Sequence, residues 1–199
     1  NLGIANSQII GGYAGAISAN CYPEADILID NCFVGADVYI EGAQQDGGIV
    51  SYAQNRSGTA VLEISNCYSA APGVDGGIIG SAYKLYYSIH DCYTVGSQLY
   101  GGASSANTLL DGEVVYDNYS DTGSRGTFVA NADMLGELAK DSMSGLDFES
   151  TFETVKGSTP KLSKFKTYDA GEVEHPTPVF TNVMAVGGDL RNGNAQYLK

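Results

Sequence analysis

The chain has 199 residues, enough for one domain or one domain with an appendage. Its 10 Lys and Arg against 23 Asp and Glu give a formal net charge of −13. That charge argues against nucleic acid and anionic membranes as partners, because both would repel this surface. A hydrophobic content of 43% excludes a disordered chain, and no apolar run is long enough for membrane insertion. Because the sequence starts at Asn1 without a methionine, we expect it to be part of a larger polypeptide.

The composition changes along the chain. Residues 1–120 hold two basic side chains, Arg56 and Lys84, twelve acidic ones and 12 of the 14 tyrosines. Residues 121–199 hold the other eight basic residues and five of the six phenylalanines. We therefore expect β-helical repeats over 1–120 and a capping segment with a short helix over 121–165. Residues 166–199 would form a linker, an extension or the start of a neighbouring domain.

Two signatures recur four times in residues 1–120. Glycine doublets begin at positions 11, 47, 76 and 101, and each is followed by small or apolar residues. The second signature is an Asn or Asp, a Cys or Asn, and an aromatic residue: Asn31-Cys32-Phe33, Asn66-Cys67-Tyr68, Asp91-Cys92-Tyr93 and Asp117-Asn118-Tyr119. Its middle residues, at 32, 67, 92 and 118, are 35, 25 and 26 residues apart. Fixed signatures at variable spacing are typical of solenoid coils with insertions in their turns.

The repeats read as short strands. Ile27–Ile29, Leu62–Ile64 and Tyr87–Ile89 place apolar residues at every second position, which is the period of a strand. The apolar runs after the glycine doublets are typical of buried strands. We predict a mainly β fold, a right-handed parallel β-helix (solenoid) of about four coils with a small C-terminal α/β cap, in which equivalent strands stack about 4.8 Å apart.

The second signature predicts a bend in each coil. Asn and Asp are the non-glycine residues that best tolerate the left-handed conformation such a bend needs. Cys32, Cys67 and Cys92 would then point inward and stack as small apolar fillers of a structural core, with Asn118 in the last coil. The aromatic residues beside them would point outward or into the turn, as a ladder of Phe33, Tyr68, Tyr93 and Tyr119.

These motifs resemble a known family. A glycine doublet with Ile-Val or Ile-Ile, followed by Ile-x-Asn-Cys-Tyr, resembles the GLUG-type β-helical repeats of bacterial cell-surface and secreted proteins. The resemblance covers roughly residues 1–120, and Asn1-Leu2-Gly3-Ile4 resembles the opening of a coil in such arrays. It implies an adhesin-like, extracellular module, at the cell surface or secreted, with a host or cell-wall glycan or protein as partner. Departures are Ser51 and Ser105 in place of glycine, and Asn118 in place of cysteine.

Residues after 120 predict a closing element. Asn131 would cap a helix over Ala132–Lys140, whose apolar stripe is Met134, Leu135 and Leu138. Gly157–Leu162 reads as a turn that leads into a strand, and in the related arrays a similar segment ends the β-helix. Further on, 172–178 reads as a linker and 179–186 as a strand.

The cysteines and histidines do not predict a metal site. No CxxC spacing occurs, and His90 and His175 lie in different halves of the chain, so zinc is disfavoured. Three stacked free thiols are preferred, while a disulfide between adjacent coils or between Cys21 and Cys32 stays open. Calcium is the one possible cofactor, with Asp111, Asp117 and Asp121 as weak candidates for its oxygen ligands.

No catalytic residue is predicted with any specificity, and enzyme activity is disfavoured. Two S-x-x-K matches, Ser81–Lys84 and Ser158–Lys161, lack the helix and the partner motifs that activate such a serine. β-Helices also serve as polysaccharide lyases and glycosidases, and two basic residues in 1–120 argue against cleavage of an anionic polysaccharide. A hydrolase of neutral glycans would use carboxylates from this set: Glu24, Asp26, Asp37, Glu41, Asp46, Asp75 and Asp111.

The ladder of Phe33, Tyr68, Tyr93 and Tyr119 is the best positive lead to a ligand. Aromatic rings at coil spacing would dock the apolar faces of sugars, unless they pack against one another or beneath insertions. The first hypothesis is a non-catalytic extracellular module of a bacterial surface protein, adhesin-like or spacer, that binds glycan or protein. The second is a fragment or accessory domain of a β-helical carbohydrate-active enzyme, a glycoside hydrolase.

Overall fold

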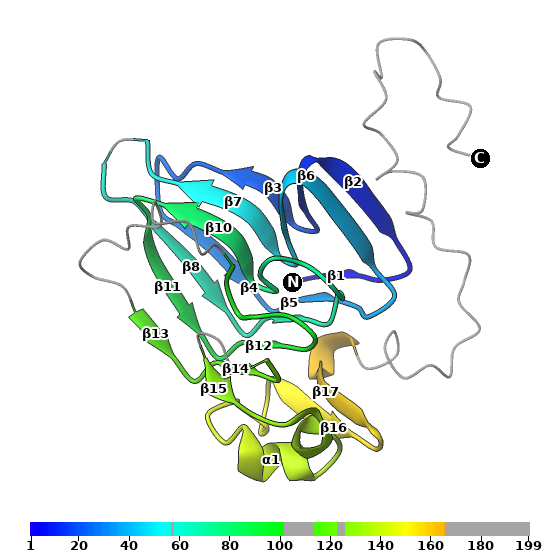
Figure 1. The fold of residues 1–199 in the computed structure, drawn as a ribbon. Coiled ribbons are helices and arrows are strands. Elements are labelled where there is room, and N and C mark those ends of the chain that lie inside the picture. The colour runs from blue at the N-terminus through cyan, green and yellow to red at the C-terminus, as the bar shows by residue number, and fades with distance from the viewer. Residues whose placement is uncertain (57, 102–113, 123–125, 166–199) are drawn as a thin grey trace.

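The computed structural model describes residues 1–56, 58–101, 114–122 and 126–165, and within them the fold is mainly β, as predicted (Figure 1). The strands lie in several short, separate sheets. The only helices of these residues are α1 (Leu138–Ser142) and the 3-10 helices η1 (Asn131–Met134) and η2 (Ser163–Phe165). The expected linker over 172–178 and strand over 179–186 lie outside the described residues.

Every strand pair before residue 129 in the described ranges is parallel. The longest sheet runs in the order β1 (Leu2–Ile4), β5 (Cys32–Val34), β9 (Tyr68–Ser69), β12 (Tyr93–Thr94), β14 (Tyr119–Ser120), β15 (Thr127–Phe128). A second runs β4 (Ile27–Asp30), β8 (Val61–Ser65), β11 (Tyr86–His90), β13 (Val114–Tyr116). A third contains β3 (Ser18–Cys21), β7 (Val50–Gln54) and β10 (Ile79–Tyr83), and a fourth β2 (Gln8–Gly15) and β6 (Tyr39–Gly47).

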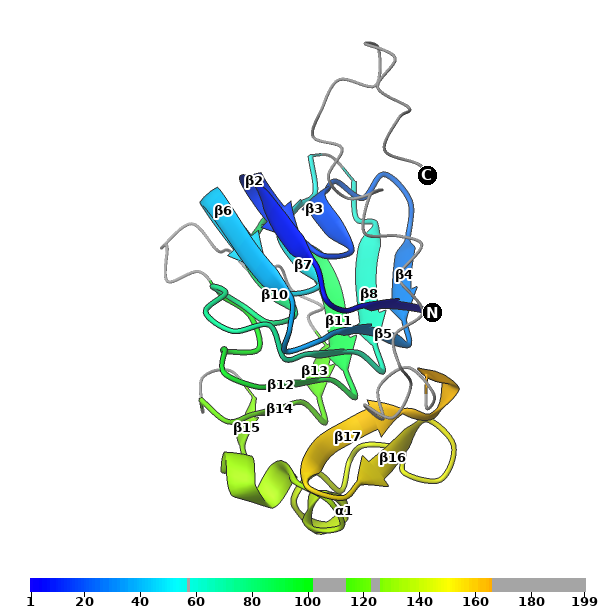
Figure 2. The ribbon, with the colours of Figure 1, turned by 90° about the vertical axis from the view of Figure 1, so that its right-hand side faces the viewer.

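The register of these sheets aligns equivalent positions of the repeat copies. Ile29 of β4 pairs with Ile64 of β8, which pairs with Ile89 of β11. Tyr68 and Tyr93 pair in the longest sheet. The three segments predicted as strands from their alternation are therefore strands, and each lies beside its counterpart from the next copy (Figure 2).

The bend in each copy is confirmed. Asn31, Asn66, Asp91 and Asp117 have φ of 53°, 52°, 54° and 49°, the left-handed conformation that the second signature predicts. Asn and Asp adopt it at lower cost than other side-chain-bearing residues because their short polar groups hydrogen-bond locally. The bend lets an apolar residue and the cysteine three positions later both enter the core.

The glycine doublets permit a close approach of backbones. A Cβ on Gly76 would clash with the carbonyl of Ile79 and the amide of Gly101. A Cβ on Gly47 would clash in the same way with Val50 and Gly80. Glycine is therefore required at Gly47 and Gly76, where neighbouring copies are in contact through main chain.

The buried apolar residues form two clusters. The larger one lies between the parallel sheets and includes Ile49, Leu62, Ile64 and Ile78, all fully buried. The smaller one joins the aromatic residues of the second signature to the segment after residue 128, including Met134. The parallel sheets thus have one core, and a second core attaches the closing segment along the aromatic residues of all four copies.

The closing segment departs from the prediction in its helix. Gly136, with φ of 59°, separates η1 from α1, so Ala132–Lys140 is not one helix. Asn131 is the first residue of η1, so the cap position belongs to Ala130, and Leu138 is exposed. The buried residues are Met134, Ala139, Met143 and Leu146, because the break rotates the second turn.

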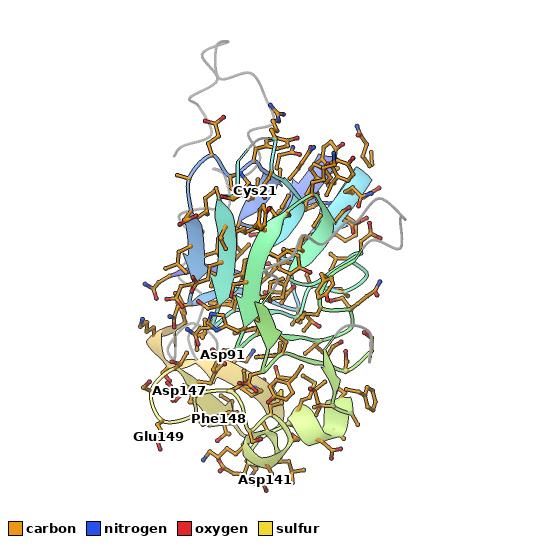
Figure 3. The ribbon with its side chains drawn as sticks, turned by 90° about the vertical axis from the view of Figure 1, so that its left-hand side faces the viewer. Cys21, Asp91, Asp141, Asp147, Phe148 and Glu149 are labelled. Carbon is orange, nitrogen blue, oxygen red and sulfur yellow. The ribbon has the colours of Figure 1, made fainter. Side chains whose placement is uncertain are left out.

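The turn into a strand is confirmed. Gly157, with φ of 73°, joins β16 (Phe152–Val155) to β17 (Ser158–Leu162), and the two strands form an antiparallel hairpin. The hairpin and α1 lie together at one end of the parallel sheets (Figure 1). Figure 3 shows Asp141, Asp147, Phe148 and Glu149 at this end, while Cys21 lies toward the other.

Candidate functional site

The thiols of the repeat motif lie next to one another. Cys32, Cys67 and Cys92 are buried, and these three and Cys21 are free, so neither disulfide alternative is present. The sulfur of Cys67 accepts the backbone N–H of Cys32 at 3.3 Å and lies 2.9 Å from the carbonyl oxygen of Ser65, to which it donates. Hydrogen bonding to Cys67 and burial raise the pKa of Cys32, and burial raises the pKa of Cys67. Cys32 and Cys67 are therefore neutral, unreactive thiols.

The aromatic residues of the same motif form a second column. The rings of Phe33 and Tyr68 are stacked with centroids 5.3 Å apart, and those of Tyr68 and Tyr93 are stacked at 4.9 Å. Tyr119 pairs with Tyr93 in the parallel sheet. The ladder expected from the spacing of the motif is therefore present.

The expectation that this ladder is exposed to solvent is wrong. Phe33, Tyr68, Tyr93 and Tyr119 are 2%, 0%, 0% and 6% exposed, so they offer no platform to a sugar. The closing segment covers these four rings with its own apolar side chains. The sequence was also compatible with this packing, which is the alternative to a ligand platform.

Specific contacts attach the column to the closing segment. The hydroxyl of Tyr93 donates to the carbonyl of Pro160, and its ring lies 6.1 Å from that of Phe152. Phe165 packs edge-on against Phe33, with centroids 5.1 Å apart. These contacts give the aromatic column a structural role.

The carboxylates considered for glycan hydrolysis do not gather in one place. Asp26 accepts the backbone N–H of Val61 at 2.9 Å, and Glu41 accepts the hydroxyl of Tyr39 at 2.7 Å. Glu24 and Asp37 are exposed in turns, and Asp111 lies outside the described residues. One pair is close: Asp46 accepts the backbone N–H of Asp75 at 2.7 Å, and burial together with the charge of Asp46 raises the pKa of Asp75.

The calcium candidates are not brought together. Asp121 accepts the backbone N–H of Gly96 at 2.8 Å, Asp117 lies at a bend beside Gly145, and Asp111 falls outside the described residues. In the part of the chain that the structure describes, no group of three or more His, Cys, Asp and Glu side chains lies close enough to hold a metal ion. Calcium stays a prediction.

Polar side chains stand next to the bends, where the strands of the second sheet end. Asp30 accepts hydrogen bonds from Asn66 at 2.8 Å and from Asn31 at 2.6 Å. Although burial opposes the shift, these bonds lower the pKa of Asp30. In the third copy His90 lies 2.6 Å from Asp91 and 3.5 Å from Glu63, as Nδ1···Oδ2 and Nε2···Oε1 distances. These groups stabilise the bends and explain the polar residues of the motif.

The S-x-x-K matches are not on helices. Ser81 is buried in β10, and Lys84 follows that strand in a turn. Ser158 and Lys161 belong to β17. Neither pair has the helical spacing that places a lysine beside a nucleophilic serine.

A tyrosine cluster that the sequence did not reveal spans β2 of the fourth sheet and the third sheet with the turns after its strands, and we call Tyr13, Tyr22, Tyr52 and Tyr83 the tyrosine face. The ring of Tyr52 lies 5.6 Å from that of Tyr13 and 6.2 Å from that of Tyr22. Burial, followed by the neighbouring tyrosines, raises the pKa of Tyr52, and Arg56 opposes the shift. All four tyrosines are half-buried. Tyr13, Tyr52 and Tyr83 each follow one of the first three glycine doublets, and this recurrence was the signal in the sequence that could have revealed the cluster.

Comparisons of the chain with models of protein families, with curated proteins and with solved structures find no match. The resemblance to GLUG-type repeats therefore stays a prediction. No helix among the described residues is both long and apolar enough to span a membrane.

Proposed function

We propose that the chain is a non-catalytic, extracellular structural module of a bacterial surface or secreted protein, adhesin-like or spacer, built as a right-handed parallel β-helix. In this proposal each copy of the repeat is one coil, and the closing segment after residue 120 caps the last coil. The GLUG-type motifs of residues 1–120 supply the assignment to bacterial surface proteins.

The observation that carries the proposal is the register of the sheets. Phe33 pairs with Tyr68, Tyr68 with Tyr93, and Tyr93 with Tyr119, always in parallel. Ile29, Ile64 and Ile89 align in a different sheet. A chain that returns to the same register in two sheets, copy after copy, favours a solenoid over a sandwich of antiparallel strands.

The two ends of the sheets differ in a way that fits a module of a longer array. β1, β2, β3 and β4 each form the end of their sheet and leave one edge unpaired. At the opposite end the chain continues from β15 into η1 and α1, and the hairpin of β16 and β17 with η2 then lies along the aromatic column as far as Phe33 of the first copy. We propose that further coils precede the open edges within a larger polypeptide.

Cross-linking tests the coil register. Leu28 and Glu63 pair on the exposed sides of β4 and β8, so the double variant Leu28→Cys/Glu63→Cys brings two sulfurs within disulfide range. Glu63 in turn pairs with Ser88, which places Ser88 two strands from Leu28. We expect Leu28→Cys/Glu63→Cys to cross-link on mild oxidation and the control Leu28→Cys/Ser88→Cys not to, by mass spectrometry of peptides. Equal cross-linking of both pairs would refute the stacked arrangement.

One observation favours the alternative, an accessory domain or fragment of a glycoside hydrolase. Asp46 and Asp75 are neighbours, and the raised pKa of Asp75 is the property of a general acid beside an ionised carboxylate. If this pair were catalytic, the protein would hydrolyse aryl glycosides and Asp75→Asn would abolish the activity. Our proposal predicts no hydrolysis by either form, with Glu24→Gln as the matched control.

A further inference from the structure

We propose that the tyrosine face, with Arg56 and Lys84, binds a glycan that carries a single carboxylate. This inference does not rest on the β-helical module proposed above, because it uses only β2, the third sheet and the turns that follow the strands of that sheet.

The two cations of residues 1–120 both lie over rings of this face. The guanidinium carbon of Arg56 is 3.8 Å from the centroid of Tyr22, and Nζ of Lys84 is 5.4 Å from the centroid of Tyr83. The same stretch carries twelve acidic residues. Cation–π contacts hold these side chains against the rings while the charges stay exposed to solvent. The tyrosine face is therefore a cationic area on an otherwise acidic surface.

The backbone of Lys84 is a second, independent observation. Six non-glycine residues of the described ranges have positive φ; five are Asn or Asp, and the sixth is Lys84, with φ of 45°. A lysine gains no local hydrogen bond in this conformation, so an Asn would form the same bend at lower cost. Strained residues gather at functional sites, and here the strain keeps a positive charge at the edge of the tyrosine face.

The polar groups of the face suit a sugar. The hydroxyl of Tyr52 donates to Gln54 at 3.1 Å, and that of Tyr22 donates to Asn20 at 3.4 Å. Amide side chains supply both donors and acceptors for sugar hydroxyls, and tyrosine rings supply apolar surface at low entropic cost. β7 is hydrogen-bonded on both sides, so this part of the sheet cannot add a peptide as a further strand.

Charge complementarity selects the kind of glycan. A carboxylate accepts a bidentate pair of hydrogen bonds from a guanidinium, and a neutral sugar does not use that donor set as strongly. A polyanionic glycan is disfavoured because its other charges would meet a chain of net charge −13. A glycan with one carboxylate fits both conditions, because it can pair with the guanidinium and carries no further negative charge.

The test compares cellobiouronic acid with cellobiose, which differ in one carboxylate, by calorimetry at low salt on the full chain. We expect the acid to bind about tenfold more tightly than the neutral sugar, with an advantage that shrinks as salt rises. Equal affinity for the two sugars, or no binding of either, would overturn the proposal.

Variants separate recognition from folding. Arg56→Gln and Lys84→Asn should each remove most of the acid's advantage, and Lys84→Asn should unfold at the same or a higher temperature because Asn suits the bend. Tyr22→Ala should weaken the binding of both sugars. Lys140→Gln and Tyr39→Ala are the matched controls, a cation and a tyrosine away from the face, and should change neither affinity. The proposal fails if Lys140→Gln removes the advantage, or if Arg56→Gln and Lys84→Asn leave it intact. The cross-linking experiment is unaffected by any of these results, so the two proposals fail separately.

Discussion

Asn118 shows what the cysteines of the repeat do. Its amide oxygen accepts the backbone N–H of Cys92 at 3.1 Å, and its amide nitrogen donates to the carbonyl of Ile89 at 2.7 Å. Cys67 of the second copy contacts the equivalent groups of the first copy, the N–H of Cys32 at 3.3 Å and the carbonyl of Ile29 at 3.7 Å. The thiol is therefore a hydrogen-bonding group as well as an apolar filler, and the Cys-to-Asn change of the last copy preserves that role.

This equivalence predicts the order of two substitutions at residue 67. Cys67→Val keeps the volume but leaves the buried N–H of Cys32 without its acceptor, which should cost about 1–3 kcal/mol of unfolding free energy. Cys67→Asn should cost less, because its amide replaces both interactions. Denaturant unfolding measures the two values. A valine variant as stable as the asparagine variant would mean that the thiol serves only to fill space.

At the scale of elements, the turn between α1 and β16 depends on one carboxylate. Asp147 accepts the backbone N–H groups of Glu149 and Ser150 at 2.9 and 3.0 Å, and the hydroxyl of Thr151 at 2.9 Å. Hydrogen bonds, first from the Ser150 side chain, lower the pKa of Asp147 to about 2. This turn sets the start of the strand that brings Phe152 onto the aromatic column.

The lowered pKa gives a pH dependence with a definite sign. The folded pKa lies below the unfolded one, so the stabilisation is present above about pH 4 and is lost as the pH falls through about 2. We expect Asp147→Ala to lose about 1 kcal/mol at neutral pH, after allowance for its exposure to solvent, and to lose less toward pH 2. Unfolding of wild type and variant from pH 7 to 2 measures the difference, with the exposed Asp141→Ala as control. A constant difference over this range would contradict the assignment.

For the whole molecule, the unequal ends have a consequence in solution. Ile10 on β2 and Leu28 on β4 are 62% and 63% exposed, and both strands end their sheets. Unpaired, apolar edges favour association with other strands, and charged residues on an edge oppose it.

We therefore expect the chain to self-associate at high concentration and the double variant Ile10→Lys/Leu28→Lys to remain monomeric. Sedimentation equilibrium measures the difference. Leu138→Lys, at an exposed apolar residue of the closing segment, is the control and should leave the association unchanged. If that control abolishes association and the edge variant does not, the interacting surface lies at the capped end.

The sequence by itself determined the local features of the chain. The bends at Asn31, Asn66, Asp91 and Asp117 follow from the conformational preferences of two residue types, which act within a few residues. The strand segments follow from alternation over four or five residues, and the parallel pairing follows from recurrence of the motif. The winding of these strands into a right-handed helix remains a proposal.

Only the tertiary structure decided which surfaces are exposed. Nothing near Tyr93 in sequence shows that Pro160 and Phe152 cover its ring, because contacts across some sixty residues leave no local pattern. Separation in sequence also hides the gathering of Tyr13, Tyr22 and Tyr52 with Arg56, which come from two different sheets and their turns. Burial depends on what the rest of the chain packs against, so the ladder predicted to bind ligand belongs to the core, and the exposed aromatic surface lies elsewhere.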